Sequence, residues 1–229
     1  MNKIRLVLFD VDGVLLDSLL PHLKICEDKN IEYKLGLKIP SPAQLKEMAR
    51  NKIQISPMKY FFLAVGFPEE FAEKANLQYN KVFMQRYAPA PFAHVHETLK
   101  VLHDGGLRLG IVTSNVRANI VAALGSSMNY FDPGLIFCKD DSDLSKAAAI
   151  SGAMKKAQTR PAETLYVGDQ SPDWDAAKAA GTSFLGVTYG WGISEQDRDK
   201  FPLVPDVGGI AAYILSRTEP INQTDSFVS

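Results

Sequence analysis

The strongest constraint on the fold is an apolar run near the N-terminus that stops at a carboxylate. Residues 4–9 show no regular alternation of polar and apolar side chains, which is typical of a strand buried on both faces of a parallel sheet. Asp10 follows directly, and Asp12 and Gly13 come next. Because ligands bind beyond the carboxyl ends of the strands in an open α/β sheet, we expect Asp10 to point into a crevice and Asp12 to follow on the first turn.

Two carboxylates so close together have a chemical implication. They repel each other unless a cation lies between them or one of them keeps its proton. A divalent cation would hold Asp10 ionised as a nucleophile, while Asp12 would exchange a proton with a leaving group and then with water. Asp-x-Asp-Gly is also an ordinary exit from a strand, because aspartate and glycine are common turn residues. The later segments of the chain bear on this choice.

Strand and helix signals alternate through most of the chain. One block interrupts this alternation. Residues 19–88 show helical periodicity without strand signals, and Pro89 follows the block. We therefore expect an α/β fold with a doubly wound, Rossmann-like parallel sheet in residues 1–18 and 89–229, and an inserted all-helical cap in residues 19–88. The further predicted strands are residues 107–112, 135–138, 164–167 and 183–188.

Polar residues follow two more of these strands and would share the crevice with Asp10. Thr113 and Ser114 offer hydroxyls and free helix amides, which suit a phosphate oxygen, although Thr-Ser-Asn is also a good helix N-cap. Asp169 ends another strand, and Asp173 begins the next helix. With Asp10 and the Asp12 carbonyl, Asp169 would give Mg²⁺ three oxygen ligands, and Asp173 would either orient this shell or cap its helix.

A lysine would complete the site by neutralising the carboxylates and a bound phosphate together. Lys146 lies near a helix start, and Lys139 lies directly at a strand end. Either could instead be a solvated surface lysine, so the choice stays open.

These segments together resemble the motifs of the haloacid-dehalogenase-like hydrolase superfamily, in its phosphoglycolate-phosphatase-like branch with a helical cap. The resemblance covers essentially the whole chain, with four motifs in the right order. The third motif is the weakest, because many relatives have Lys-Pro where this chain has Lys146-Ala147. The matching segments are residues 10–18, Val112–Asn115, Lys146, and Gly168–Asp169 with Asp173.

The resemblance implies a Mg²⁺-dependent phosphatase that acts on a small phosphomonoester, phosphoglycolate-like or a sugar phosphate. Asp10 would attack the phosphorus in line to form an aspartyl-phosphate. Asp12 would protonate the leaving oxygen and then activate water, and Lys146 would assist catalysis. The implied phosphate-binding residues are Gly13, Thr113, Ser114, Asn115 and Lys146, and the implied metal-binding residues are Asp10, Asp12, Asp169 and Asp173.

Two other functions stay open. Val14 stands where many family phosphatases have threonine, and Asp-Gly-Val also occurs in sugar-phosphate mutases of the same fold. A mutase has to keep water away from its aspartyl-phosphate, which is the task of a closing cap. A catalytically retired binding or regulatory module is the other alternative.

Substrate choice would depend on the cap and on the loop after the last strand. Arg50, Lys52 and Lys59 either meet a second anionic group or are solvated charges. His22 lies near the hinge, where it could make a polar contact to substrate, but we expect it at the surface. Trp191 either lines the crevice or packs within its loop.

Charge and length exclude several partners. The chain has 229 residues and a formal net charge of −1, which gives no electrostatic footprint for nucleic acid. No apolar run approaches the roughly 20 residues of a membrane span, and no signal peptide is recognisable. Cys26 and Cys138 do not form a metal-ligand spacing. We expect a cytoplasmic monomer or homodimer.

Overall fold

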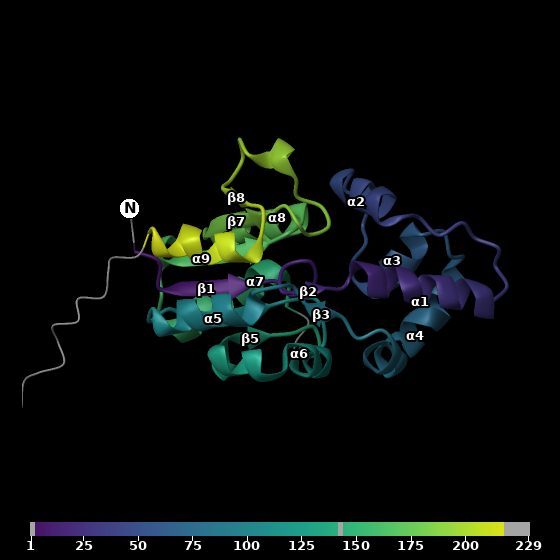
Figure 1. The fold of residues 1–229 in the computed structure, drawn as a ribbon, viewed down its shortest axis with the longest axis horizontal. Coiled ribbons are helices and arrows are strands. Elements are labelled where there is room, and N and C mark those ends of the chain that lie inside the picture. The colour runs from purple at the N-terminus through teal and green to yellow at the C-terminus, as the bar shows by residue number, and fades with distance from the viewer. Residues whose placement is uncertain (1–2, 142–143, 218–229) are drawn as a thin grey trace, which may run out of the picture.

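The computed structural model describes residues 3–141 and 144–217. Its main feature is a six-stranded sheet with the strand order β5-β4-β1-β6-β7-β8, in which every pairing is parallel (Figure 1). The five predicted strands are confirmed, and the two-residue β8 at the edge was not predicted. The strands are β1 (Leu6–Phe9), β4 (Arg108–Val112), β5 (Ile136–Phe137), β6 (Thr164–Gly168), β7 (Ser183–Val187) and β8 (Leu203–Val204).

Strand β1 lies in the middle of the sheet and is fully buried. Phe9 at its end is in register with Ile111 of β4 on one side and with Val167 of β6 on the other. The chain therefore reverses its winding direction at β1, and a doubly wound sheet forms its ligand crevice at such a point. The residues that follow β1, β4 and β6 meet there.

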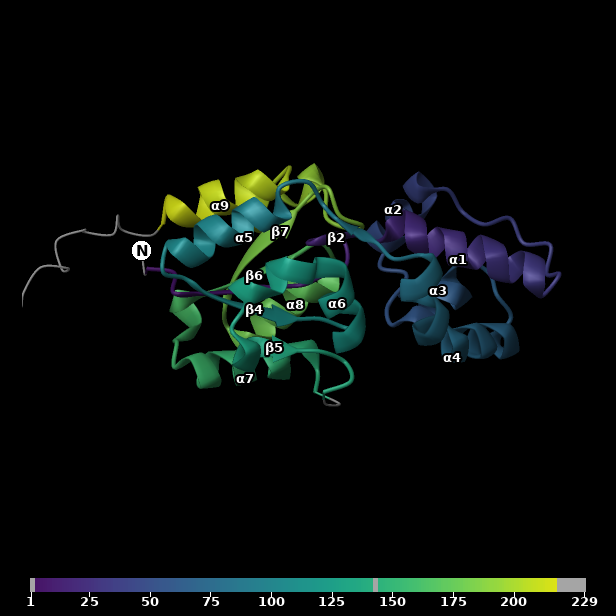
Figure 2. The ribbon, with the colours of Figure 1, turned by 60° about the horizontal axis from the view of Figure 1, so that its bottom comes forward.

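Helices cover both faces of the sheet (Figure 2). On one face, Val7 and Phe9 of β1 share an apolar core with α5, α6 and α9, and on the other face Leu6 and Leu8 share a core with α7 and α8. This alternation follows from the twofold repeat of side chains along a strand. The helices are α5 (Val95–Asp104), α6 (Arg117–Leu124), α7 (Lys146–Ala157), α8 (Ser171–Ala180) and α9 (Val207–Leu215).

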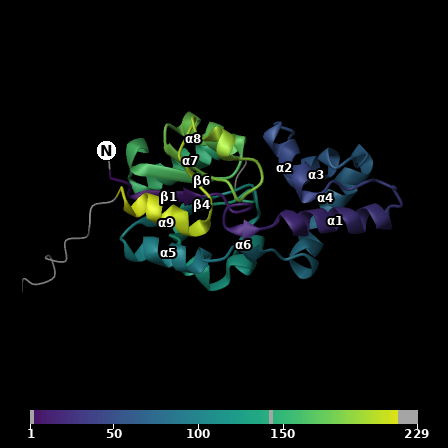
Figure 3. The same cartoon turned by 45° about the horizontal axis from the view of Figure 1, so that its top comes forward.

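Helices α1 to α4, here called the helical insert, form a separate bundle beyond the carboxyl ends of the strands (Figures 1 and 3). The bundle has its own apolar core, which includes Leu45, Phe61 and Phe83. The chain enters and leaves it through a two-stranded antiparallel ribbon. The limits at residues 19 and 88 stay a prediction. The elements are α1 (Leu19–Glu32), α2 (Pro42–Arg50), α3 (Met58–Ala64), α4 (Glu69–Arg86), β2 (Leu16–Asp17) and β3 (Ala90–Pro91).

Close packing at β4 gives a first prediction. A Cβ atom at Gly110 would lie 2.6 Å from the carbonyl oxygen of Leu135 and 2.7 Å from Cδ2 of Leu8. We expect Gly110→Ala to lower the free energy of unfolding by about 1–3 kcal/mol in urea denaturation, because the backbone has to move apart. Gly208→Ala on α9, where the nearest atom would be 3.4 Å away, is the control and should not destabilise. Equal unfolding curves for the two variants would contradict this.

Among the described residues, no helix has the length and apolar character needed to cross a membrane.

Candidate active site

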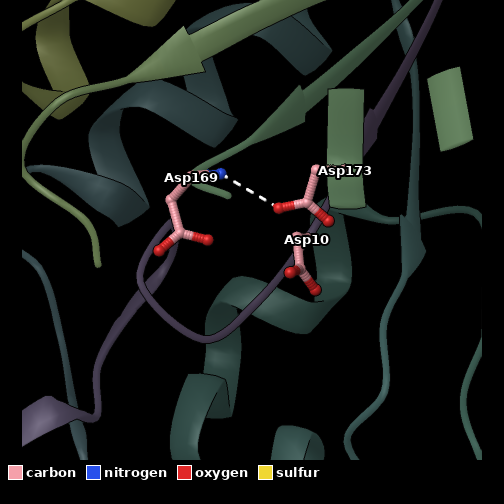
Figure 4. A group of neighbouring side chains, drawn as sticks. All are labelled: Asp10, Asp169 and Asp173. Carbon is pink, nitrogen blue, oxygen red and sulfur yellow. Dashed lines mark hydrogen bonds between the residues drawn. The ribbon is translucent and has the colours of Figure 1, made fainter. Parts of the chain in front are cut away.

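Three buried carboxylates meet at the carboxyl ends of the central strands. Asp10 follows β1, Asp169 follows β6, and Asp173 lies in the first turn of α8. One carboxylate oxygen from each residue lies within 4.8 Å of the other two (Figure 4). The structure therefore brings together three of the four aspartates that the sequence places in the metal site. The carboxylate of Asp12 is outside this group.

Main-chain amides hold the carboxylates of Asp169 and Asp173 in place. Oδ2 of Asp173 accepts hydrogen bonds from the N–H groups of Asp169 (3.2 Å) and Gln170 (3.0 Å), so this residue also caps α8. Oδ2 of Asp169 accepts from the N–H of Trp191 at 2.7 Å. Oδ1 of Asp169 is buried and has no hydrogen-bond partner among the described residues. One oxygen thus stays free to bind an ion.

Lys146 is the one of the two candidate lysines that reaches the carboxylates. Its Nζ lies 3.1 Å from Oδ2 of Asp10 and 2.6 Å from Oδ1 of Asp173. Lys139 also lines the adjoining cavity but is exposed and makes neither contact. Burial would lower the pKa of Lys146, but Asp10 and Asp173 outweigh this effect and raise its pKa well above the ordinary value. The lysine is therefore an ammonium.

The cluster carries more negative than positive charge. Burial raises the pKa of Asp10 to about 6, although Lys146 opposes the shift. Burial also raises the pKa of Asp169 well above its ordinary value, and the neighbouring carboxylates of Asp173 and Asp10 add to it. Buried carboxylates of this kind need a further cation to stay ionised. Oxygen-only donors with one unpaired oxygen suit a hard divalent cation.

The turn after β1 places Asp12 beside this cluster. Gly13 has φ +79°, and a Cβ there would lie 2.1 Å from Oδ2 of Asp169, so the turn requires glycine. Oδ2 of Asp12 accepts a hydrogen bond from Nδ2 of Asn115 at 2.9 Å. Oδ1 of Asp12 has no partner among the described residues. Asn115 thus fixes one oxygen of Asp12 and leaves the other available.

The segment after β4 contributes hydroxyls to the same place. Thr113 is buried, Ser114 is exposed, and both line the cavity together with Asn115. The alternative that these residues form the N-cap of α6 is wrong, because the N-cap residue is Val116. The sequence pattern did not show that the Asn115 side chain would be committed to Asp12.

A cavity of about 440 Å³ separates the acidic cluster from the helical insert. Of the three basic residues proposed for substrate selection, only Lys52 lines it. Arg50 lies 3.8 Å from Glu47, and Lys59 is paired with two glutamates. Trp191 lines the cavity, which is the first of its two alternatives. Its ring packs into the core of the helical insert, a contact that neither alternative included.

The expectation of a surface position for His22 is wrong. The residue is buried on α1 and lines the cavity. Its Nδ1 lies 2.5 Å from the carbonyl oxygen of Ser18, which can only accept, so Nε2 accepts the hydrogen bond from the Tyr79 hydroxyl at 2.9 Å. Burial lowers the pKa of His22 and favours the neutral ring. His22 lies three residues after Leu19 and four before Cys26, which places all three on one face of the helix. This spacing could have indicated that His22 is buried.

Comparison with known proteins identifies the family. The family model described as "Haloacid dehalogenase-like hydrolase" matches residues 7–187. The chain belongs to this family. This haloacid dehalogenase-like hydrolase is 28% identical over 202 residues to the phosphoglycolate phosphatase of Vibrio vulnificus strain YJ016, with 85% of this chain and 88% of the relative covered. It is 31% identical to the phosphoglycolate phosphatase of Pseudomonas fluorescens strain Pf0-1, with 82% and 70% covered.

Solved structures agree with the fold of this haloacid dehalogenase-like hydrolase. A haloacid dehalogenase-like family hydrolase from Streptococcus pneumoniae superposes with a TM-score of 0.76 at 21% identity, and 93% of this chain and 99% of that chain are covered. At this level of identity the similarity shows the fold, a parallel sheet with a helical insert.

Proposed function

We propose that the chain is a Mg²⁺-dependent phosphatase that hydrolyses a small phosphomonoester through an aspartyl-phosphate on Asp10. The observation that carries this proposal is the position of Asp10, at the end of the central strand, within 4.8 Å of two further carboxylates and 3.1 Å from the Lys146 ammonium. The phosphatase names of relatives that align over most of the chain support it. A phosphoglycolate-like ester or a sugar phosphate is the proposed substrate class.

The two aspartates of the first motif divide the chemistry. A carboxylate oxygen of Asp10 forms a bond to phosphorus as the bond from phosphorus to the alcohol oxygen breaks. Oδ1 of Asp12, which is unpaired among the described residues, donates the proton that the alcohol oxygen needs. The same carboxylate then takes a proton from the water that attacks phosphorus, and Asp10 is released.

The remaining groups hold charge and position the phosphoryl group. Mg²⁺, held by the Asp10, Asp169 and Asp173 side chains and the Asp12 carbonyl, would offset negative charge on the transferring phosphoryl group when bound. Donors from Gly13, Thr113, Ser114 and Lys146 bind its oxygens. The phosphate-binding role expected of Asn115 stays a prediction, and its hydrogen bond to Asp12 adds a positioning role.

Metal removal is the test of this proposal. We expect EDTA to lower the rate of p-nitrophenyl phosphate hydrolysis by at least about 100-fold, and Mg²⁺ to restore it. At about 100 times its dissociation constant, Mg²⁺ should also raise the thermal midpoint of unfolding by about 5–10 °C, and less in Asp169→Asn. Hydrolysis that continues unchanged in EDTA would contradict the proposal.

Product analysis separates the phosphatase from the mutase alternative. A phosphatase releases one inorganic phosphate for each ester consumed, including sugar phosphates. Conversion of a sugar phosphate into its isomer without phosphate release would favour the mutase.

A further inference from the structure

The helical insert presents a single charged side chain to the cavity. Among its described residues that line the cavity, this is Lys52, which makes no ion pair within the described part of the chain. The other two basic residues of the insert considered above differ from Lys52, because neither Arg50 nor Lys59 lines the cavity. Nζ of Lys59 lies 3.3 Å from Oε1 of Glu69 and 2.7 Å from Oε2 of Glu73, so this lysine is already paired. Lys52 is thus available to a ligand where these neighbours are not.

The backbone at Lys52 is one that favours glycine. Helix α2 ends in a Schellman motif, in which the N–H of Lys52 donates to the carbonyl of Ala49 and the N–H of Ile53 donates to the carbonyl of Met48, both at 3.0 Å. Lys52 occupies the left-handed position of this motif, with φ +60°. A lysine is strained there relative to glycine, so the backbone supplies no reason for a lysine. Of the four non-glycine residues with positive φ in residues 3–141 and 144–217, only Lys52 lines the cavity.

The other described residues of the insert that line the cavity are uncharged. Ile53 is 43% exposed and lines the cavity, as do Met58 and Phe61. The His22–Tyr79 pair deeper in the cavity is neutral. An anion on this side of the cavity therefore has one cationic partner from the insert. The other exposed lysine on the cavity, Lys139, belongs to the sheet side, because its N–H donates to the carbonyl of Asn115 at 3.0 Å.

We propose that Lys52 selects substrates whose leaving group carries a second anion, either a carboxylate or another phosphate. This assignment rests on the proposed phosphatase function. The acidic cluster and its lysine take the phosphoryl group that is transferred, and Lys52 attracts the anion at the opposite end of the same molecule. Arg50 and Lys59 have no part in this selection.

Matched pairs of esters measure the selection directly. Phosphoglycolate is compared with 2-hydroxyethyl phosphate, and 1,3-propanediol bisphosphate with 3-hydroxypropyl phosphate, in saturating Mg²⁺. We expect Lys52→Met to lower the ratio of kcat/KM between anionic and neutral ester about 5- to 10-fold in at least one pair, with the neutral esters changed less than about twofold. The pair that responds shows whether the second anion is a carboxylate or a phosphate.

Lys52→Gly separates this role from a structural one. Because glycine relieves the left-handed strain, we expect a thermal midpoint equal to or above that of the wild type. The same variant should lose the preference for the anionic ester as fully as Lys52→Met does. A structural lysine would give the reverse result, a lower thermal midpoint with an unchanged ratio.

Two lysine variants serve as controls. Lys59→Met should leave both ratios unchanged, and Lys139→Met should change the two members of each pair by the same factor. Unchanged ratios in both Lys52 variants, with the neutral esters still hydrolysed, overturn the assignment. The assignment is also overturned if the ratio of kcat/KM between anionic and neutral ester falls only in Lys139→Met. If the wild type hydrolyses p-nitrophenyl phosphate but none of the four esters, this assignment fails and the proposed phosphatase function stands. If it hydrolyses neither p-nitrophenyl phosphate nor these esters in saturating Mg²⁺, both fail.

Discussion

Replacing Asp10 with asparagine is expected to lower kcat by about four orders of magnitude or more, because an amide cannot attack phosphorus. The expected loss is large because, in the proposed mechanism, Asp12 and the carboxylates that would hold the cation all assist the attack by Asp10. Without that nucleophile, no aspartyl-phosphate forms for them to assist. Phosphate release from p-nitrophenyl phosphate in saturating Mg²⁺ measures the effect.

The thermal midpoint of Asp10→Asn is the control for folding. Burial raises the pKa of Asp10 to about 6, so the ionised side chain costs folding free energy above that pH, and a neutral amide removes this cost. We therefore expect a thermal midpoint at pH 7.5 without Mg²⁺ that is equal to or above that of the wild type. A folded Asp10→Asn protein that keeps more than about 1% of the activity would contradict the nucleophile assignment.

Lys146→Met is expected to lower kcat by about 100- to 1,000-fold, the effect typical of losing one group that stabilises transition-state charge. The Nζ of Lys146 is 3.1 Å from the proposed nucleophile, and the more exposed Lys139 makes no such contact. Lys139→Met is therefore the matched control and should cost less than about tenfold. A larger loss in Lys139→Met than in Lys146→Met, with both proteins folded, would reverse the assignment.

Much of the fold and the acidic cluster follow from local sequence patterns. Largely apolar stretches predicted five of the six strands of the main sheet. Apolar periodicity and helix-start signals such as Ser41-Pro42 predicted the helices of the insert. Because parallel strands end at the same edge, the polar residues after β1 and β6 had to meet, and Asp10 and Asp169 do.

The parts that were not predicted depend on partners far apart in the chain. The hydrogen bond between His22 and Tyr79 joins residues 57 positions apart, and the bond between Asn115 and Asp12 spans 103 positions. Hydrophobic periodicity does not reveal such long-range hydrogen bonds, because each of these residues alone is compatible with several environments. The choice between Lys139 and Lys146 was open for the same reason, because it depends on where α7 begins relative to the end of β1.

One side chain belongs to both halves of the molecule. The main-chain N–H of Trp191 donates a hydrogen bond to the carboxylate of Asp169, one of the three candidate metal ligands, while its ring packs edge-on against His22 and Phe61 of the insert. Any motion that swings the bundle away from the strands has to withdraw the indole from these rings or pull on the aspartate. Trp191 therefore links the two halves mechanically, so that opening of the cavity would act directly on the carboxylate of Asp169.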